Sequence, residues 1–242
     1  MRPTTIPPQD SPLIPSAPLD TAGSRGNLLA TLSDADLAAL RAVSSERALR
    51  SGTSLFRQGE LHEGIFIILA GRVRTYYTGA SGREITLAYW PAGHFVGGPE
   101  IFGGSPHVWS GEAVGPVRVL HARGAELRAV LPRAPGLAVA LLEAVSEKGR
   151  CYSEFVQTLG TRSASERLAH LLLHLSMMHG RPAAQGIAVG KRLSQEDMAR
   201  LIGTTRQWVA ATLKRFSWDG IIDLDERSIL IRDQERLRRL AG

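Results

Sequence analysis

Apolar residues are spaced in different ways along this chain, and each spacing predicts a different kind of structure. Between residues 49 and 120 they form short runs separated by glycines, a pattern typical of a small antiparallel barrel or jelly roll. The five clearest runs are Thr53–Phe56, Ile65–Leu69, Val73–Tyr77, Glu84–Tyr89 and Val117–Leu120. Residues 1–27 hold six of the 13 prolines and little that could form a core, so we expect a flexible tail there.

A long helix is predicted from Pro135 to about Leu159. Along it, apolar positions and one lysine recur at alternating intervals of three and four residues, the heptad spacing of paired helices. These positions are Ala138, Leu141, Val145, Lys148, Tyr152, Phe155 and Leu159. The seam can pack on the barrel of its own chain or on a second copy, with the lysine fixing the register. We favour the second interpretation, a homodimer whose interface holds Leu141, Val145, Lys148, Tyr152, Phe155 and Leu159.

Two short helices joined by a glycine are predicted in the last third of the chain. Ser194 caps the first helix, Gly203 ends it, and Thr204 or Thr205 caps the second. Two apolar runs that follow predict a small β-wing, at Ile221–Leu224 and Ser228–Arg232. This order of elements indicates a winged helix-turn-helix, whose second helix can enter the major groove of DNA.

The distribution of charge points to a nucleic acid as the partner. The chain has 242 residues and a formal net charge of +6, and the 14 basic and nine acidic residues after residue 160 account for +5 of it. No acidic residue occurs between Asp197 and Asp219, and a basic segment of this kind suits a polyphosphate. The candidate contacts to double-stranded DNA are Ser194, Thr204, Thr205, Arg206, Gln207, Ala211, Lys214 and Arg215.

Composition excludes several kinds of site and protein. A single cysteine, Cys151, rules out disulfides within the chain, cysteine-ligated iron–sulfur clusters and four-cysteine zinc sites. No apolar run approaches the roughly 20 residues of a membrane span, and no signal peptide is evident, so we expect a cytoplasmic protein with no membrane partner.

Enzyme motifs are missing as well. The sequence has no P-loop, no Gly-x-Ser-x-Gly and no His-Glu-x-x-His, and His170 and His174 lack a third metal ligand. We therefore expect neither an enzyme nor a metal site. Two other classes stay as alternatives: a barrel-based enzyme or binding protein without DNA, and a dimer whose basic domain binds anionic surfaces without sequence preference.

The helix pair is the last of several motifs that occur in a characteristic order. The others are Arg57-Gln58-Gly59-Glu60, Gly71-Arg72-Val73, Gly93-His94-Phe95-Val96-Gly97, and Ser153-Glu154 with Val156. Together they resemble the cyclic-AMP-receptor/fumarate–nitrate-reductase (CRP/FNR) regulators over residues 28–233. The resemblance implies an α+β fold with an N-terminal cyclic-nucleotide-binding-like β-barrel (jelly roll), a long dimerisation helix and a C-terminal winged helix-turn-helix. It also implies a homodimeric transcription regulator on a two-fold operator, with RNA polymerase as a further partner.

On this basis we divide the chain into a proline-rich tail (1–27), a sensory barrel (28–134), a dimerisation helix (135–160) and a DNA-binding domain (161–242). In the resemblance, Arg206 falls on the family's guanine-contacting arginine. Gln207 stands in place of a cytosine-contacting glutamate, and Ala211 in place of a second basic reader. We therefore expect an operator that differs from the family's commonest half-site.

The stretch Gly97–Ser110 matches the part of the family's barrel that holds a cyclic nucleotide through a glutamate and an arginine. Here no arginine lies between Arg83 and Arg118, so cyclic AMP bound in the usual way would leave its phosphate without a partner. We expect no required cofactor and an unknown effector of another kind, in a pocket formed by Gly97, Gly98, Glu100, Phe102, His107, Trp109, Ser110, Tyr152 and Ser153. The alternatives are a barrel without an effector, a heme held by His94 or His107, and a cyclic dinucleotide bound by arginines elsewhere.

Overall fold

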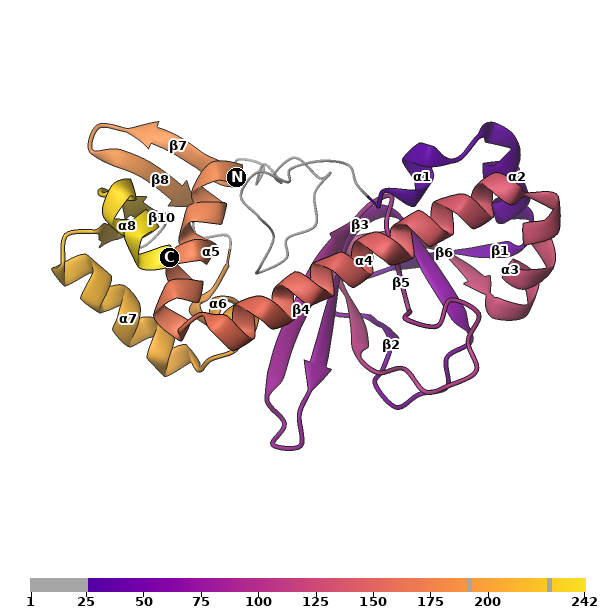
Figure 1. Ribbon diagram of the computed structural model, residues 1–242, viewed down its shortest axis with the longest axis horizontal. Coiled ribbons are helices and arrows are strands. Elements are labelled where there is room, and N and C mark those ends of the chain that lie inside the picture. The colour runs from indigo at the N-terminus through magenta and orange to yellow at the C-terminus, as the bar shows by residue number, and fades with distance from the viewer. Residues whose placement is uncertain (1–25, 191–192, 226–227) are drawn as a thin grey trace. The chain divides into compact units, whose positions relative to one another are not determined.

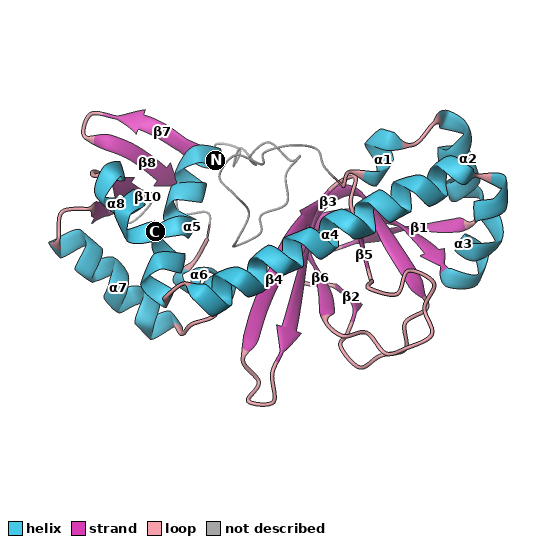
Figure 2. Cartoon of the chain, viewed as in Figure 1, coloured by secondary structure: helices cyan, strands magenta, loops and turns pink. Residues whose placement is uncertain are grey.

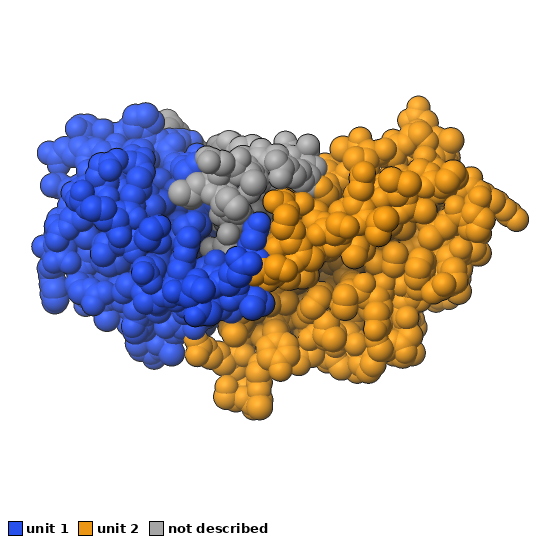
Figure 3. Space-filling model, in the orientation of Figure 1, with its two compact units in different colours: residues 1–8, 15–21, 154–242 blue, residues 9–14, 22–153 orange. Residues whose placement is uncertain are grey.

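The computed structural model describes residues 26–190, 193–225 and 228–242, which form two compact units (Figures 1 and 3). The boundary between the units falls inside the long helix α4 (Pro135–Thr161), between Ser153 and Glu154. The predicted helical segment 135–160 therefore contributes to both units. Of the described helices, none is both long and apolar enough to cross a membrane.

The N-terminal unit combines an antiparallel sheet with several helices (Figure 2). Its elements before α4 are α1 (Leu28–Thr31), α2 (Asp34–Ala42), β1 (Ser44–Leu49), β2 (Ser54–Phe56), β3 (Gly64–Thr78), β4 (Glu84–Pro91), β5 (Phe95–Val96), β6 (Ser110–Arg123), α3 (Gly124–Val130) and the 3-10 helix η1 (Leu131–Arg133). The strands pair in the order β1-β6-β3-β4, with β2 also on β6 and β5 on β3. This arrangement agrees with the predicted jelly roll, and adds β1, β5 and α3, which the apolar pattern did not reveal.

The longest strand, β3, joins two runs that the sequence analysis predicts as separate strands, Ile65–Leu69 and Val73–Tyr77. Between them Gly71 has φ +85°, and a Cβ there would lie 2.3 Å from the carbonyl oxygen of Pro116 on β6. The pairing register with β6 shifts on both sides of Ala70. A bulge next to the glycine therefore carries one strand through the point where the apolar alternation breaks.

The first half of α4 belongs to the core of the barrel. Thirteen buried residues from the helices and the sheet form one apolar cluster: Leu28, Leu40, Ile65, Ile67, Phe95, Leu120, Ala122, Leu127, Ala134, Leu137, Ala140, Leu141 and Ala144. The last four of them lie on α4. Burial of these side chains holds the helix against the sheet of its own chain.

The C-terminal unit contains the predicted helix-turn-helix and a four-stranded sheet. Its elements after α4 are α5 (Ala164–His179), β7 (Gly180–Ala183), β8 (Gly186–Gly190), α6 (Gln195–Ile202), α7 (Arg206–Trp218), β9 (Ile222–Leu224), β10 (Ser228–Ile231) and α8 (Gln234–Ala241). The stretch after α5 is a hairpin, and its second strand pairs with the wing, with Val189 opposite Ile229. Helix α8 packs on α5 and was not predicted, although Leu237 and Ala241 lie four residues apart and are buried.

Candidate DNA-binding face and barrel pocket

A capping box fixes the N-terminus of α6. The Ser194 hydroxyl accepts a hydrogen bond from the Asp197 backbone N–H at 3.1 Å and donates one to the Asp197 carboxylate at 2.6 Å. The same carboxylate accepts from the Ser194 backbone N–H at 3.0 Å. Ser194, predicted as a DNA contact, therefore has its hydroxyl engaged in holding α6.

A left-handed glycine sets the turn between α6 and α7. Gly203 has φ +68° and ends α6. The Thr205 hydroxyl then caps α7 by accepting a hydrogen bond at 3.2 Å from the backbone N–H three residues later. Of the two predicted caps, Thr205 is the one used, and Thr204 lies in the turn. The helix begins with Arg206 and Gln207, whose side chains are exposed.

One face of α7 is exposed from end to end. Its members, none of them acidic, recur at intervals of four, three and four residues: Gln207, Ala211, Lys214 and Trp218. The opposite side is buried and holds Val209, Thr212, Leu213 and Phe216. Trp218 is 85% exposed and was not predicted as part of this face. The signal was present, since Trp218 continues the helical spacing of Lys214.

The four basic residues of the acid-free segment differ in their contacts. Arg215 donates to the Ser165 hydroxyl on α5 at 2.9 Å, and Arg200 pairs with a glutamate one turn earlier on α6 at 3.3 Å. Arg206 and Lys214 form no ion pair within the described ranges. Arg215, a predicted DNA contact, thus ties α7 to α5 but keeps its charge, whereas Arg206 and Lys214 have no side-chain partner among the described residues.

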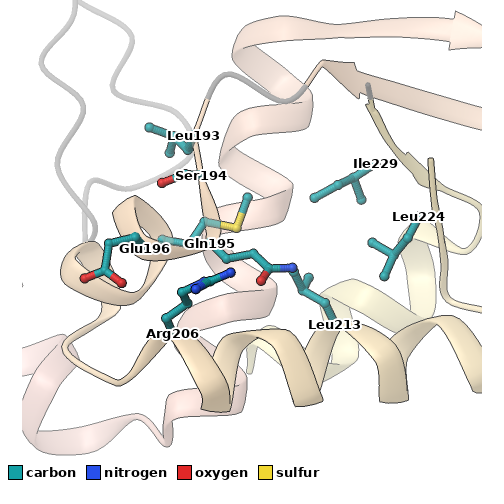
Figure 4. Close-up of a pocket in the computed structure, with 9 residues that line it drawn as sticks. Leu193, Ser194, Gln195, Glu196, Arg206, Leu213, Leu224 and Ile229 are labelled. Carbon is teal, nitrogen blue, oxygen red and sulfur yellow. The ribbon is translucent and has the colours of Figure 1, made fainter. Parts of the chain in front are cut away.

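A hollow of about 720 Å³ lies between the start of α6, the start of α7 and the wing (Figure 4). Its wall is largely apolar, and the lining residues are Leu193, Ser194, Gln195, Glu196, Met198, Arg206, Leu213, Leu224 and Ile229. Figure 4 shows the Arg206 side chain pointing toward Gln195. The helix pair and the wing therefore meet around one opening at the base of α7.

A second cavity, of about 130 Å³, lies in the N-terminal unit between the sheet and α4. It is lined by Thr75, Trp90, Phe95, Val96, Gly97, Gly98, Pro99, Trp109, Val145, Lys148, Gly149 and Tyr152. Four of the nine predicted effector residues are among them: Gly97, Gly98, Trp109 and Tyr152. Lys148 was not predicted as a pocket residue, although it lies one turn before Tyr152 on the same helix.

Phe102 and His107, both predicted in the pocket, lie elsewhere in the unit. The Arg128 guanidinium lies over the Phe102 ring, 4.1 Å from its centroid. His107 stacks between Phe56 and His62, with ring centroids 4.4 and 4.3 Å away. The loop between β5 and β6 holds these two rings outside the lining of the cavity, which corrects the prediction.

Three further predicted pocket residues are also absent from the lining of this cavity. Glu100 is exposed and accepts a hydrogen bond from the Ser105 hydroxyl. The Ser110 hydroxyl accepts from the backbone N–H of Gln58 at 3.0 Å. Ser153 is exposed on α4 and donates to a carbonyl one turn earlier at 2.9 Å. Their hydrogen bonds stabilise loops and helix, so the structure corrects their assignment to the pocket.

The predicted dimer seam faces inward. Leu141 lies in the barrel core, and Phe155 is only 4% exposed within the single chain. Three others line the cavity: Val145, Lys148 and Tyr152. Leu159 is half-buried, and its carbonyl accepts from Arg167 at 3.5 Å. Five of the six predicted interface side chains, those of Leu141, Val145, Lys148, Tyr152 and Phe155, thus pack on their own chain, which agrees with the alternative interpretation of the seam.

Lys148 is the cation of the cavity. Its Nζ lies 3.1 Å from the centroid of the Trp90 ring and 4.8 Å from that of Phe95. Burial lowers the pKa of Lys148 to about 7. Burial also raises the pKa of the Tyr152 hydroxyl far above its ordinary value, so this group stays protonated.

Two family models match the chain. The Crp-like helix-turn-helix domain matches residues 166–240, and the cyclic nucleotide-binding domain matches residues 46–133. The CRP-like cAMP-activated global transcriptional regulator of Mycobacterium tuberculosis is 29% identical over 190 residues, 78% of this chain and 85% of that protein. The chain belongs to the CRP/FNR family. It is a DNA-binding transcription regulator of this type and not an enzyme.

Other relatives of this CRP/FNR regulator agree. The nitrogen fixation regulation protein FixK of Azorhizobium caulinodans is 27% identical over 201 residues, 82% of this chain and 80% of that protein. Among solved structures, the c-di-GMP responsive regulator CLP of Xanthomonas campestris has a TM-score of 0.73 at 20% identity, covering 82% of this chain and 99% of that one. A CooA mutant from Carboxydothermus hydrogenoformans has a TM-score of 0.69 at 22% identity, covering 84% and 90%. These two structures confirm the predicted fold class.

The histidines of this CRP/FNR regulator do not fit a heme in the barrel cavity. Burial lowers the pKa of His94 to about 3 and that of His107 to about 4, so both rings are neutral, the form that can ligate iron, and only their positions argue against a heme here. Both rings are buried, and neither lines the cavity. Over the residues that the structure describes, no three His, Cys, Asp or Glu side chains are grouped to hold a metal ion.

Proposed function

We propose that this regulator is a homodimer that binds a two-fold operator through α7 and receives an effector other than a cyclic mononucleotide in its barrel cavity. The proposal includes a cytoplasmic location and RNA polymerase as a further partner. One observation carries the DNA-reading part: α7 presents a continuous exposed face without acidic residues, next to the available cations Arg206 and Lys214.

Arg206 and Gln207 are the proposed base readers. Both lie in the first turn of α7, the end of a recognition helix that contacts base edges. An arginine can take O6 and N7 of guanine, and a glutamine can take N6 and N7 of adenine. Ala211 suits apolar contact with a thymine methyl group, and Lys214, two turns from the N-terminus, suits a phosphate.

Selection from a randomised duplex library tests this assignment. We expect a palindromic site, because a two-fold dimer presents two copies of α7. Arg206→Ala should lose about 1–3 kcal/mol of discrimination at one base pair of each half-site. Arg133→Ala, an exposed arginine on η1, is the matched control and should leave the selected sequence unchanged. Recovery of no two-fold site would contradict the proposal.

The outward side of α4 is the proposed dimer interface. Its exposed positions recur at intervals of three and four residues, in the order Val139, Leu142, Ser146, Gly149, Ser153 and Val156. Val139 is 57% exposed, and Leu142 and Val156 are each 67% exposed. Heptad spacing lets two such helices pair along their length, and the small residues between the apolar ones let their backbones approach closely.

Sedimentation of single variants tests the interface. Leu142→Arg places a charge in the middle of the proposed contact and should convert the dimer to a monomer. Val114→Arg is the matched control, since Val114 is an apolar residue of the barrel unit that is 41% exposed and lies outside α4. A Leu142→Arg protein that stays dimeric would place the interface elsewhere.

The effector part of the proposal rests on the charge of the cavity. A cyclic nucleotide carries a phosphate, for which an arginine fork is the usual partner in proteins. Among the residues that the structure describes, the cavity lining contains no arginine and one lysine. In a thermal-shift assay we expect cyclic AMP to leave the melting temperature unchanged. A stabilisation by cyclic AMP that saturates at one ligand per chain would contradict this part alone.

A further inference from the structure

The Lys148 side chain is half-buried, and no described carboxylate pairs with its ammonium. Its Nζ lies on the Trp90 ring, with the Phe95 ring beyond it. No ion pair within the described ranges involves this residue, and the adjacent Glu147 is bound to Arg150 instead. A buried ammonium that only aromatic faces stabilise keeps a large part of its desolvation cost.

Two polar groups of the cavity wall already have partners on the sheet. The Trp90 indole N–H donates to the Thr75 hydroxyl at 3.1 Å, and that hydroxyl donates to the Ala88 carbonyl at 3.4 Å. Aromatic rings make up much of the rest of the cavity wall, among them Trp109 and Tyr152, whose ring centroids lie 5.3 Å apart. An incoming molecule therefore meets aromatic surface, the Tyr152 hydroxyl and one positive charge.

The size of the cavity restricts what it can hold. Its volume of about 130 Å³ is close to that of an apolar protein cavity of roughly 150 Å³ that accepts benzene. A ligand with one ring fits this volume, whereas a nucleotide with its base, sugar and phosphate exceeds it.

We propose that this cavity binds a single-ring aromatic monocarboxylate, whose carboxylate pairs with the Lys148 ammonium while its ring lies among Trp90, Trp109 and Tyr152. This assignment deepens the proposed effector site and rests on it for its regulatory meaning. A carboxylate fits the wall because it needs one cation, whereas a phosphate ester needs several donors. The aromatic faces suit a ring in offset or edge-on contact.

Proton uptake is a measurable consequence. Since the pKa of Lys148 is about 7 in the free protein, an ionised carboxylate beside it raises that pKa. Binding is then independent of pH below 7, and weakens by up to about tenfold per pH unit above 7. The other titratable groups facing Lys148 are Cys151 and Tyr152 on α4 and His94 from the loop after β4. The pKa of His94 is about 3 and that of Tyr152 is raised, so both stay neutral in this range.

Titration calorimetry on the full chain, from about pH 6 to about pH 8.5, tests the proposal. The probes are benzoate, its uncharged isostere benzamide, inorganic phosphate and cyclic AMP. We expect benzoate to bind once per chain, at least about tenfold more tightly than the other three, and to weaken above pH 7. Lys148→Met should remove the preference for benzoate over benzamide, whereas Arg128→Met, which deletes a cation–π pair outside the cavity, should keep it.

A spectroscopic readout keeps the test valid if Lys148→Met does not fold. The chain has three lysines, Lys148, Lys191 and Lys214, so carbon-13 signals of the lysine side chains can be assigned. Benzoate should raise the pKa of Lys148 by about one unit or more and leave Lys214 unchanged. Equal binding of benzoate and benzamide, or an unmoved Lys148, would falsify the proposal. Operator selection and sedimentation need no ligand. A failure of the proposed dimeric DNA-binding function would therefore appear in those two experiments, independently of whether benzoate binds.

Discussion

The two units place their cations in opposite settings. On α7, Arg206 and Lys214 are exposed and belong to a surface without acidic residues. In the barrel, Lys148 lies in a cavity among aromatic rings. An exposed cation keeps its hydration and acts through long-range attraction to a polyanion, which salt screens. A buried cation is weakly screened and acts on whichever single anion fits beside it.

This contrast also separates two kinds of selectivity. In the proposed function, the α7 surface attracts any nucleic acid, and discrimination comes from the few side chains that reach base edges. The proposed ligand cavity would select by shape and by the cost of leaving one charge without a partner. The two units also differ in a tryptophan beside these cations. Trp218 on α7 is 85% exposed, whereas Trp90 in the cavity wall is 1% exposed.

The largest effect expected is that of deleting the buried indole. Trp90→Ala removes a large side chain from the cavity wall and should lower the free energy of unfolding by about 3–5 kcal/mol. Trp218→Ala should change it by no more than about 0.5 kcal/mol, because that ring contributes little buried area. Urea unfolding of the two variants measures both values. Similar losses would erase the contrast between the two settings.

The second largest effect expected is a pH dependence of stability that Lys148 causes and the exposed cations of α7 do not. The ordinary lysine pKa of 10.5 falls to about 7 in the folded protein, so the unfolded chain binds one more proton between these values. The free energy of unfolding should therefore rise with pH above 7, by up to about 1.4 kcal/mol per pH unit. Lys148→Met should lack this rise, and Arg128→Met should retain it. Chemical denaturation from about pH 6 to about pH 9 follows the effect.

A smaller effect is expected at the exposed cation Lys214. Lys214→Ala should weaken operator binding about fivefold at physiological salt, equally for all sequences, and reduce the salt slope by about one. Arg215→Ala should reduce the slope by less than Lys214→Ala does, because the bond to Ser165 directs this guanidinium toward α5. Fluorescence anisotropy at several salt concentrations measures both slopes. A change for Arg215→Ala and none for Lys214→Ala would reverse the assignment of these two side chains.

The smallest effect concerns the cap of α6. Ser194→Ala removes the hydroxyl of the capping box and should lower the free energy of unfolding of the C-terminal unit by about 0.5–1 kcal/mol. Ser194→Asp keeps an acceptor at the N-cap and should restore most of the loss. Operator binding measured well below the melting temperature should change little, in contrast to Arg206→Ala. A large loss of affinity would return Ser194 to the set of DNA contacts.

The spacing of apolar residues and the capping and turn residues were enough to predict the helix pair and the wing of the C-terminal unit. Ser194 and Gly203 mark the ends of α6, and apolar residues at helical spacing give the buried side of α7. Short-range signals suffice there because caps and turns are made within a few residues. The hydrogen bond of Arg215 to Ser165 could not be predicted from these local signals, because Ser165 lies 50 residues earlier in the chain.

The barrel pocket was harder to predict because its wall is assembled from distant segments. Lys148 and Trp90 are 58 positions apart in the sequence, and heptad spacing on α4 is the same whether the seam covers a barrel or a second helix. Only the packing of α4 on the sheet separates the two interpretations. The exposed stripe from Val139 to Val156 was not predicted as the dimer interface, because serine and glycine interrupt its apolar pattern.

Helix α4 has its inward residues in the wall of the cavity and its outward residues on the proposed dimer contact. An α-helix with its side chains is about 10 Å across. In the proposed dimer, the path from a ligand to the partner subunit is therefore one helix diameter thick. A displacement of α4 by a fraction of an ångström would reach both surfaces at once, without any relay through intermediate elements.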